Sequence, residues 1–295
     1  MPEYPPQIRQ RTVAKARILL EALPYMKEHY GKVIVIKYGG AAMAEAALAK
    51  PFVKDIALLS YAGIIPVVVH GGGPQLTEVS SKMGLKTKFI GGLRVTDQET
   101  LDVATMVLAG KINTDIVALL EAGGVPAVGM SGVDGGLMLA KQKDPELGFV
   151  GEMVGVKPKV VEDVMHDFVP VIASIATDEH GQTFNVNADL AAAELAIGLG
   201  ADKLVFISDV PGLIGGDGEL MTELGAQDAL DLTTSGAVDG GMVPKLESCV
   251  RALKEGVRRV HMIDGRVEHS LVLELFTPEG VGTMITPDVS VEEDA

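Results

Sequence analysis

The chain is poor in cysteine, tryptophan and positive charge. It has one cysteine and no tryptophan, and 25 Lys and Arg stand against 40 Asp and Glu, which gives a formal net charge of −15. A single cysteine cannot form an internal disulfide, and this suits a reducing compartment. An acidic chain without a basic stripe repels a phosphate backbone, so we expect no nucleic-acid partner. Any polyanionic ligand would need a site that concentrates its own cations.

Long apolar runs are also missing. A membrane span needs about 20 consecutive apolar residues, and the apolar stretch at residues 18–26 is broken by Glu21 and Pro24. The first 17 residues are polar and basic, which is not the pattern of a cleaved signal peptide. We therefore expect a cytoplasmic protein with no membrane partner.

What the chain does contain is a repeated alternation of short β-branched runs, glycine-rich turns and helical periodicity. Strands are predicted at residues 33–36, 65–69, 125–128, 137–140, 169–173, 204–207 and 259–263. Helical patterns separate most of them, which is typical of βαβ units and a parallel sheet. We predict an α/β fold, a three-layer α/β/α sandwich with a mainly parallel central sheet. An N-terminal helix (1–30) precedes two lobes, an N-lobe (31–196) and a C-lobe (197–295).

The common nucleotide motifs are absent. There is no G-x-x-x-x-G-K-S/T loop, no G-x-G-x-x-G and no protein-kinase H-R-D and D-F-G pair. Instead, glycine-rich turns follow two predicted strands: Lys-Tyr-Gly-Gly at 37–40 and His-Gly-Gly-Gly-Pro at 70–74. Backbone N–H groups in such turns, and the helix start after Pro74, favour anions. In parallel sheets the two turns would face one crevice.

Two further segments place polar residues at helix starts. In Asn-Val-Asn-Ala-Asp at 185–189, Asn187 can cap the next helix and an acid in its first turn is favourable, but capping does not require Asn185. In Asp-Gly-Gly-Met-Val-Pro-Lys at 239–245, Lys245 lies where the helix dipole disfavours a cation. Such a local violation often marks a functional site.

Together these motifs resemble the acetylglutamate kinases, a branch of the amino-acid kinase family. The resemblance covers residues 33–285 and includes Gly-Leu-Arg-Val-Thr at 92–96 and Ser-Asp-Val-Pro-Gly at 208–212. One departure is Ala41, where this branch often has Asn. The resemblance implies ATP-dependent phosphorylation of the γ-carboxylate of N-acetyl-L-glutamate, with Mg²⁺ brought in on ATP and no metal ligands assigned to the protein.

The resemblance also implies residue roles. Lys37 and Lys245 would stabilise transition-state charge, and Asp189 would orient both. Gly72, Gly73, Arg94 and Asn185 would hold the acceptor in the N-lobe. The nucleotide would bind to the C-lobe at Asp209, Val210, Pro211, Gly212, Leu213, Ile214, Asp239, Gly240 and Gly241.

The chemistry itself explains why such a site needs cations and no general base. A γ-carboxylate has a reference pKa of about 4.3, so it is ionised at neutral pH and is already a nucleophile. The difficulty is that an anion must approach a polyanion, so alignment and charge neutralisation dominate. On this interpretation Asp189 orients the lysines.

The arginine-sensitive members of this branch have an N-terminal helix that joins dimers into a hexamer, a trimer of dimers. By resemblance we expect a homo-oligomer inhibited by L-arginine, which would bind near Glu274, Glu279 and Gly282. Packing of this helix on its own lobe is the competing interpretation.

Three other functions stay open. A sister kinase could phosphorylate N-acetyl-aminoadipate or aspartate, because one methylene changes binding by only about 1–3 kcal/mol. A non-catalytic amino-acid-binding regulator could share the fold, although it would have no use for two converging lysines. An NAD-linked oxidoreductase is disfavoured by the missing dinucleotide motif.

Overall fold

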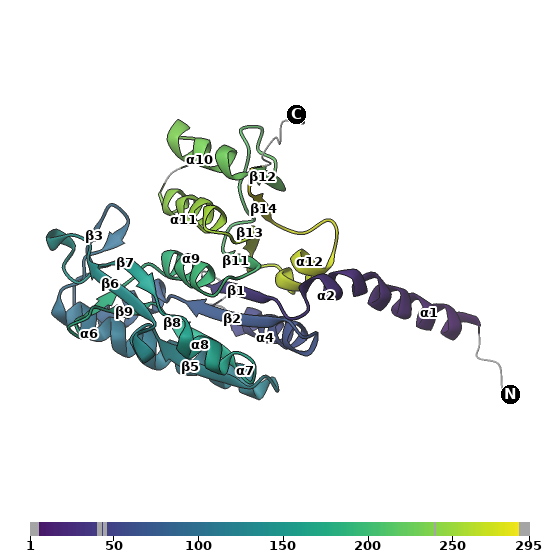
Figure 1. Ribbon diagram of the computed structural model, residues 1–295, viewed down its shortest axis with the longest axis horizontal. Helices are drawn as coiled ribbons and strands as arrows, with labels where there is room; N and C mark the ends of the chain where they lie inside the picture. The colour runs from purple at the N-terminus through teal and green to yellow at the C-terminus, as the bar shows by residue number, and fades with distance from the viewer. Residues whose placement is uncertain (1–5, 40–42, 44–45, 239, 289–295) are drawn as a thin grey trace, which may run out of the picture.

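The computed structural model describes residues 6–39, 43, 46–238 and 240–288. Its core is an eight-stranded sheet in the order β12-β14-β13-β11-β1-β2-β8-β5 (Figure 1). The pairs from β13 through β5 are parallel, and β14 runs antiparallel to β13. The strands of this sheet are β1 (Val33–Tyr38), β2 (Ile65–His70), β5 (Ala127–Ser131), β8 (Val169–Ala173), β11 (Lys203–Ser208), β12 (Glu223–Gly225), β13 (Arg259–Asp264) and β14 (Thr283–Thr286).

Helices cover both faces of this sheet. Successive residues of each strand point to opposite sides, so the apolar strands present side chains that must be buried on both faces. From β1, Val35 packs on one face with α9 (Ala188–Gly198), α10 (Ala226–Ser235) and α11 (Met242–Lys254). Ile34 and Ile36 pack on the other face with α4 (Ala46–Tyr61), α5 (Gly73–Lys82), α6 (Gln98–Thr105), α7 (Asn113–Ala122) and α12 (Ser270–Phe276). Strands buried on both faces are expected to be apolar throughout. The predicted three-layer α/β/α sandwich is confirmed.

A second, four-stranded sheet lies beside the main one. Its order is β10-β9-β6-β7, with β6 (Met138–Gln142), β7 (Gly151–Val156), β9 (Ile175–Thr177) and β10 (Thr183–Asn185). Short turns η2 (Asp134–Gly136) and η3 (Pro145–Leu147), the helix α8 (Lys159–Val164) and the hairpin of β3 (Phe89–Ile90) and β4 (Leu93–Arg94) complete this part. Of these strands the sequence analysis predicted only β6. β3, β4, β9 and β10 have three residues or fewer, and β7 contains two glycines, which weaken a strand pattern.

The N-terminal helix is present but divided. α1 (Pro6–Glu21) and α2 (Leu23–His29) meet at Ala22, and Pro24 occupies the first turn of α2, where its missing N–H costs nothing. α1 projects away from the body (Figure 1). Its side chains Ile18, Leu19 and Leu20 are 65–69% exposed.

One helical stretch, Gln98–Ala122, is long and apolar enough to cross a membrane by length and composition. It comprises α6, the π-helix η1 (Met106–Ile112) and α7. Buried side chains along it, such as Leu101, Leu108 and Leu120, are part of the protein's hydrophobic core. We therefore interpret this stretch as a core helix.

The single cysteine is part of the hydrophobic core. Cys249 lies on α11, is completely buried and has no disulfide partner. Burial raises the pKa of its thiol, so it stays protonated and packs as a small apolar side chain.

Candidate active site

The glycine-rich turns meet at one edge of the main sheet. Tyr38 at the end of β1 pairs in register with His70 at the end of β2, and on its other side with Ile207 near the end of β11. His70 pairs in turn with Ala173 of β8. The turns that follow these strands therefore share the carboxyl edge of the sheet, where ligands bind in open α/β folds.

The turn after β2 needs glycine because other groups approach it closely. Gly72 is the N-cap of α5, and a Cβ there would collide with Leu108 and Ile112 of η1. At Gly73 a Cβ would meet open space. The turn thus packs against η1 at Gly72 and has open space beside Gly73, which leaves its backbone accessible to a ligand.

Lys37 and Lys245, from opposite ends of the chain, meet at a single carboxylate. The Lys37 Nζ lies 2.9 Å from Asp189 Oδ1, and the Lys245 Nζ lies 2.8 Å from Asp189 Oδ2. The side chains of all three are at most 16% exposed. Burial alone would raise the pKa of Asp189, but the two ammonium groups outweigh it and lower that pKa to about 2.

Local structure fixes each member of this cluster. Asp189 lies in the first turn of α9, where the Asn187 side chain accepts hydrogen bonds from the backbone N–H groups of Asp189 and Leu190. Lys245 lies in the first turn of α11, and its ammonium also lies 5.1 Å from the centre of the Phe206 ring on β11. A carboxylate at a helix N-terminus and a cation over an aromatic face are both favourable.

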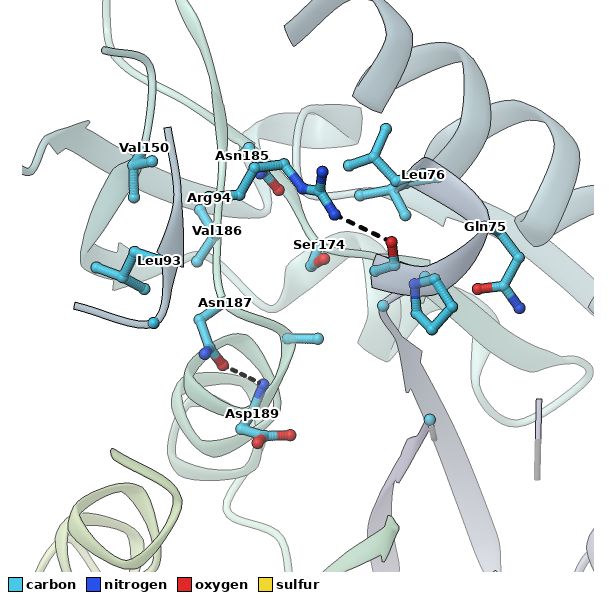
Figure 2. Close-up of a pocket in the computed structure, with 18 of the residues that line it drawn as sticks. Gln75, Leu76, Leu93, Arg94, Val150, Ser174, Asn185, Val186, Asn187 and Asp189 are labelled. Atoms are coloured by element: carbon cyan, nitrogen blue, oxygen red, sulfur yellow. Dashed lines mark hydrogen bonds between the residues drawn. The ribbon is translucent and has the colours of Figure 1, made fainter. Parts of the chain in front are cut away.

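A pocket of about 330 Å³ opens beside this cluster (Figure 2). Arg94 and Asn185 lie along one side of it, and Asp189 lies at its base. Six of the residues that the sequence singled out line it: Lys37, Gly72, Gly73, Arg94, Asn185 and Asp189. Lys245 is joined to them through Asp189.

Arg94 is held at the pocket wall. Its Nη2 donates to the Gly73 carbonyl at 3.0 Å and to Thr77 Oγ1 at 2.7 Å, and Nη1 donates to Thr87 Oγ1 at 3.2 Å. The guanidinium also stacks 5.0 Å from the centre of the Phe89 ring. Three of its five N–H groups are used in these bonds. The two threonines that steady it were not anticipated from the sequence.

The residues assigned to the nucleotide follow β11, the strand next to β1. Asp209 and Ile214 are exposed, whereas Gly212 and Leu213 are buried against β14, and the Leu213 N–H donates to Thr283 Oγ1 at 2.8 Å. Val210 and Pro211 are partly buried. Gly240 and Gly241 are exposed just before α11, and Asp239 lies outside the described residues.

A second pocket, of about 420 Å³, lies near α2, β13 and α12, and it shares no lining residue with the first pocket. It is lined by Glu274, Glu279 and Gly282, and also by Lys203 and His261, which the sequence analysis did not select. Glu274 contacts His261 Nδ1 at 2.7 Å and accepts hydrogen bonds from the backbone N–H groups of residues 281 and 282. Its carboxylate therefore already organises the loop that closes this pocket.

Within the described residues, no cluster of three or more His, Cys, Asp and Glu side chains could hold a metal ion. Mg²⁺ is commonly bound through one or two carboxylates and substrate phosphates, without a dedicated protein cage. The exposed carboxylate of Asp209 is the one group of this kind in the described nucleotide segments.

Comparison with known proteins identifies the family of this chain. The profile of the amino acid kinase family matches residues 32–264. Acetylglutamate kinase of Aquifex aeolicus is 48% identical over 93% of this chain and 98% of its own length. The enzyme of the same name from Nostoc punctiforme is 44% identical, with coverage of 94% and 95%.

Solved structures give the same result for the fold. N-acetylglutamate synthase from Neisseria gonorrhoeae, complexed with coenzyme A and N-acetyl-glutamate, has 29% identity and a TM-score of 0.83. This chain covers 63% of that longer one, with 92% of its own length aligned. Carbamate kinase from Giardia lamblia bound to AMP-PNP has 19% identity, a TM-score of 0.65 and coverage of 88% and 99%, and it shows the fold alone. The chain belongs to the acetylglutamate kinases of the amino acid kinase family.

Proposed function

We propose that this chain transfers the γ-phosphoryl group of ATP to the γ-carboxylate of N-acetyl-L-glutamate, forming an acyl phosphate for arginine biosynthesis. The observation that carries the proposal is the meeting of Lys37 and Lys245 at Asp189, beside the pocket that the glycine turn and Arg94 also line. The curated relatives at 44–48% identity support this activity.

The acceptor would lie in the pocket of Figure 2. Arg94 lines that pocket, and its two N–H groups that are not used in the bonds described above, on Nε and Nη1, can donate to an α-carboxylate. The Asn185 side chain, which donates to Thr96 Oγ1 at 3.3 Å, would meet the acetamido group. The backbone N–H groups of Gly72 and Gly73 would then face the γ-carboxylate and the phosphoryl group in transfer.

Catalysis on this proposal is charge stabilisation. The two ammonium groups would neutralise the oxygens of the transferring phosphoryl, and Asp189 would keep them in place. Asp189 forms ion pairs with two lysines and has a pKa of about 2, so it would be a poor general base. Mg²⁺ would arrive on ATP and supply further neutralisation of its phosphates.

The nucleotide would bind on the other side of the cluster, at Asp209–Ile214 and Asp239–Gly241. Lys245 lies in the helix that begins just after the second of these segments. The lobe division at residue 197 stays a proposal of the same kind. It is supported by the positions of the two sites, of which one follows β1 and β2 and the other lies after β11 and before α11.

The test is an ADP-release assay with one acceptor at a time: N-acetylglutamate, N-acetyl-aminoadipate or aspartate. We expect N-acetylglutamate to have the highest kcat/KM. A preference for N-acetyl-aminoadipate would keep the mechanism and change the substrate. No ADP release with any acceptor would support the non-catalytic regulator instead.

We further propose feedback inhibition by L-arginine at the second pocket. The pocket is lined by the buried Lys203 and by the exposed Glu279, so both signs of charge are available for an amino acid. The synthase from Neisseria gonorrhoeae, 27% identical with a TM-score of 0.79, is known in a complex with coenzyme A and L-arginine. Tyr25, Glu28 and His29 of the N-terminal helices also line the pocket.

The exposed apolar side chains of α1 support a homo-oligomer, which we propose to be a hexamer built as a trimer of dimers. Deleting residues 1–25 should abolish both hexamer formation, measured by sedimentation, and arginine inhibition. Intact arginine sensitivity in the deletion variant would exclude this mechanism of regulation. We also propose a cytoplasmic location, in keeping with the substrates.

A further inference from the structure

A buried side-chain pair lies directly beneath the glycine turn. His70 is completely buried at the end of β2, and its Nδ1 lies 2.9 Å from the carbonyl oxygen of Gly71. Its Nε2 lies 3.1 Å from the Nδ2 of Asn113, the first residue of α7. The same Asn113 amide donates to the Val171 carbonyl at 2.8 Å. The proposed mechanism gives neither side chain a role.

These contacts permit one tautomer of His70. The Gly71 carbonyl can only accept, so Nδ1 must carry the hydrogen. Nε2 is then an acceptor that faces the Asn113 NH₂ group, whose other partners are the carbonyl oxygens of Val171 at 2.8 Å and Met130 at 3.3 Å. The Asn113 amide cannot be reversed, because its oxygen would then face the carbonyl oxygen of Val171. Burial lowers the pKa of His70 to about 4, which is consistent with a neutral ring at physiological pH.

The hydrogen bond from His70 also fixes the orientation of the peptide group between Gly71 and Gly72. In a trans peptide the C=O and N–H groups point in opposite directions. The bond from His70 holds the Gly71 carbonyl toward the buried ring, so the N–H of Gly72 points the other way. Gly71, Gly72 and Gly73 line the pocket, and this N–H is therefore aimed at the side where a ligand would lie.

The helix that supplies Asn113 also presses on Gly72. Asn113 follows directly after η1, and the η1 residues Leu108 and Ile112 occupy the space that a Cβ at Gly72 would need. On the other side, a Cβ at Gly129 of β5 would collide with the Asn113 side-chain oxygen. Wide π-helical turns are frequent at functional sites, and this one is followed directly by Asn113, whose amide donates to carbonyl groups of β5 and β8.

We propose that His70 and Asn113 are positioning residues that fix the Gly71–Gly72 peptide and so aim the Gly72 N–H at the transferring phosphoryl group. This inference rests on the proposed kinase function, because only a reaction at that position gives the N–H something to stabilise. Neither side chain would touch a substrate. Their effect would pass through the orientation of one backbone donor.

Two substitutions at His70 separate this role from packing. His70→Asn keeps an N–H near the position of Nδ1 and can still donate to Gly71, whereas His70→Gln places its amide near Nε2 and cannot. We expect kcat to fall roughly 10- to 100-fold in His70→Gln and Asn113→Leu, with acceptor KM little changed, since a misplacement of about 1 Å can cost that much. His70→Asn should keep most of the wild-type kcat.

Ile116→Val, one turn further along α7, is the control for loss of core packing and should leave kcat unchanged. Equal kcat values in His70→Gln and His70→Asn, with both variants folded by circular dichroism, would overturn the proposal. Nitrogen-15 shifts of His70 give an activity-independent readout: the Nδ1–H tautomer supports the proposal and the Nε2–H tautomer refutes it. If the wild type phosphorylates no acceptor, the proposed function fails, and the shifts still test the geometry.

Discussion

The carboxylate of Asp189 bridges two ammonium groups. Replacing it by the neutral amide of Asn removes the negative charge that they share. Lys37 and Lys245 lie 2.9 and 2.8 Å from its two oxygens. Even at about 8 Å, the largest separation that these contacts allow, two ammonium charges in an effective dielectric of about 20 repel by about 2 kcal/mol. In Asp189→Asn the neutral amide has one accepting oxygen in place of two and no longer balances the charge of the two ammonium groups, so we expect the two side chains to move apart from their positions in the site.

The expected result is a fall in kcat of about 10²–10³-fold, at least the loss for one transition-state donor. Acceptor KM should change little, since Arg94 and Asn185 stay in place. The assay is steady-state ADP release at saturating ATP. A matched control is Glu194→Gln, which removes another ion pair between α9 and α11, from Glu194 to Arg251 at 2.7 Å. A kcat within about twofold of wild type in Asp189→Asn, well short of that loss, would refute the reasoning.

The same variant has a pH signature. The pKa of Asp189 in the folded protein is about 2, below the value of 3.8 for the free side chain. The unfolded chain therefore takes up the proton first as the pH falls. The resulting stabilisation, about 2–3 kcal/mol, is present above about pH 4 and is lost toward pH 2. The difference in unfolding free energy between wild type and Asp189→Asn should thus be smaller at pH 3 than at pH 7. Equal differences in urea titrations at both pH values would contradict this.

Three further substitutions probe single groups of the site. Lys245→Ala should lower kcat by about 10²–10³-fold with acceptor KM little changed, and an unaltered kcat would remove Lys245 from the mechanism. Arg94→Ala should instead raise acceptor KM strongly, because a charge-assisted contact to a carboxylate is lost; a purely kcat effect would argue against that contact. Gly39→Ala should lower kcat with little loss of stability, because its Cβ would collide with the movable end of the Lys37 side chain. A large drop in Tm, measured by calorimetry, would point to a structural role for Gly39.

The central strands and the glycine turns could be predicted from the sequence because their causes are local. A strand buried on both faces is a continuous apolar run, and Val33–Tyr38 and Ile65–His70 extend such runs by only one or two residues. The rule that ligands lie at carboxyl ends of parallel strands then brings the two turns together. Pairing of the lysines with Asp189 came from family resemblance, since no spacing in the chain implies it.

The supporting interactions could not be predicted because their partners are distant in sequence. Asn113 is a polar residue within an apolar helical pattern, and its partners His70 and Val171 are 43 and 58 residues away. From the sequence we also expected the Glu274 carboxylate to be available to a ligand. In the structure two backbone N–H groups and His261 already contact it. Only the three-dimensional arrangement shows which polar groups are already satisfied.

The position of Asp189 also explains how Lys245 can occupy an unfavourable place. A cation in the first turn of α11 is repelled by the positive end of that helix, by about 0.3–1 kcal/mol. Asp189 lies in the first turn of α9, where the same effect favours an anion, and its contact with Lys245 joins the two helix starts. The contact with Asp189 thus offsets the repulsion between Lys245 and the positive end of α11, while the positive end of α9 stabilises Asp189. A chain with a net charge of −15 can in this way keep two lysines and Arg94 near one pocket, where the local excess of positive charge is available to a phosphorylated substrate.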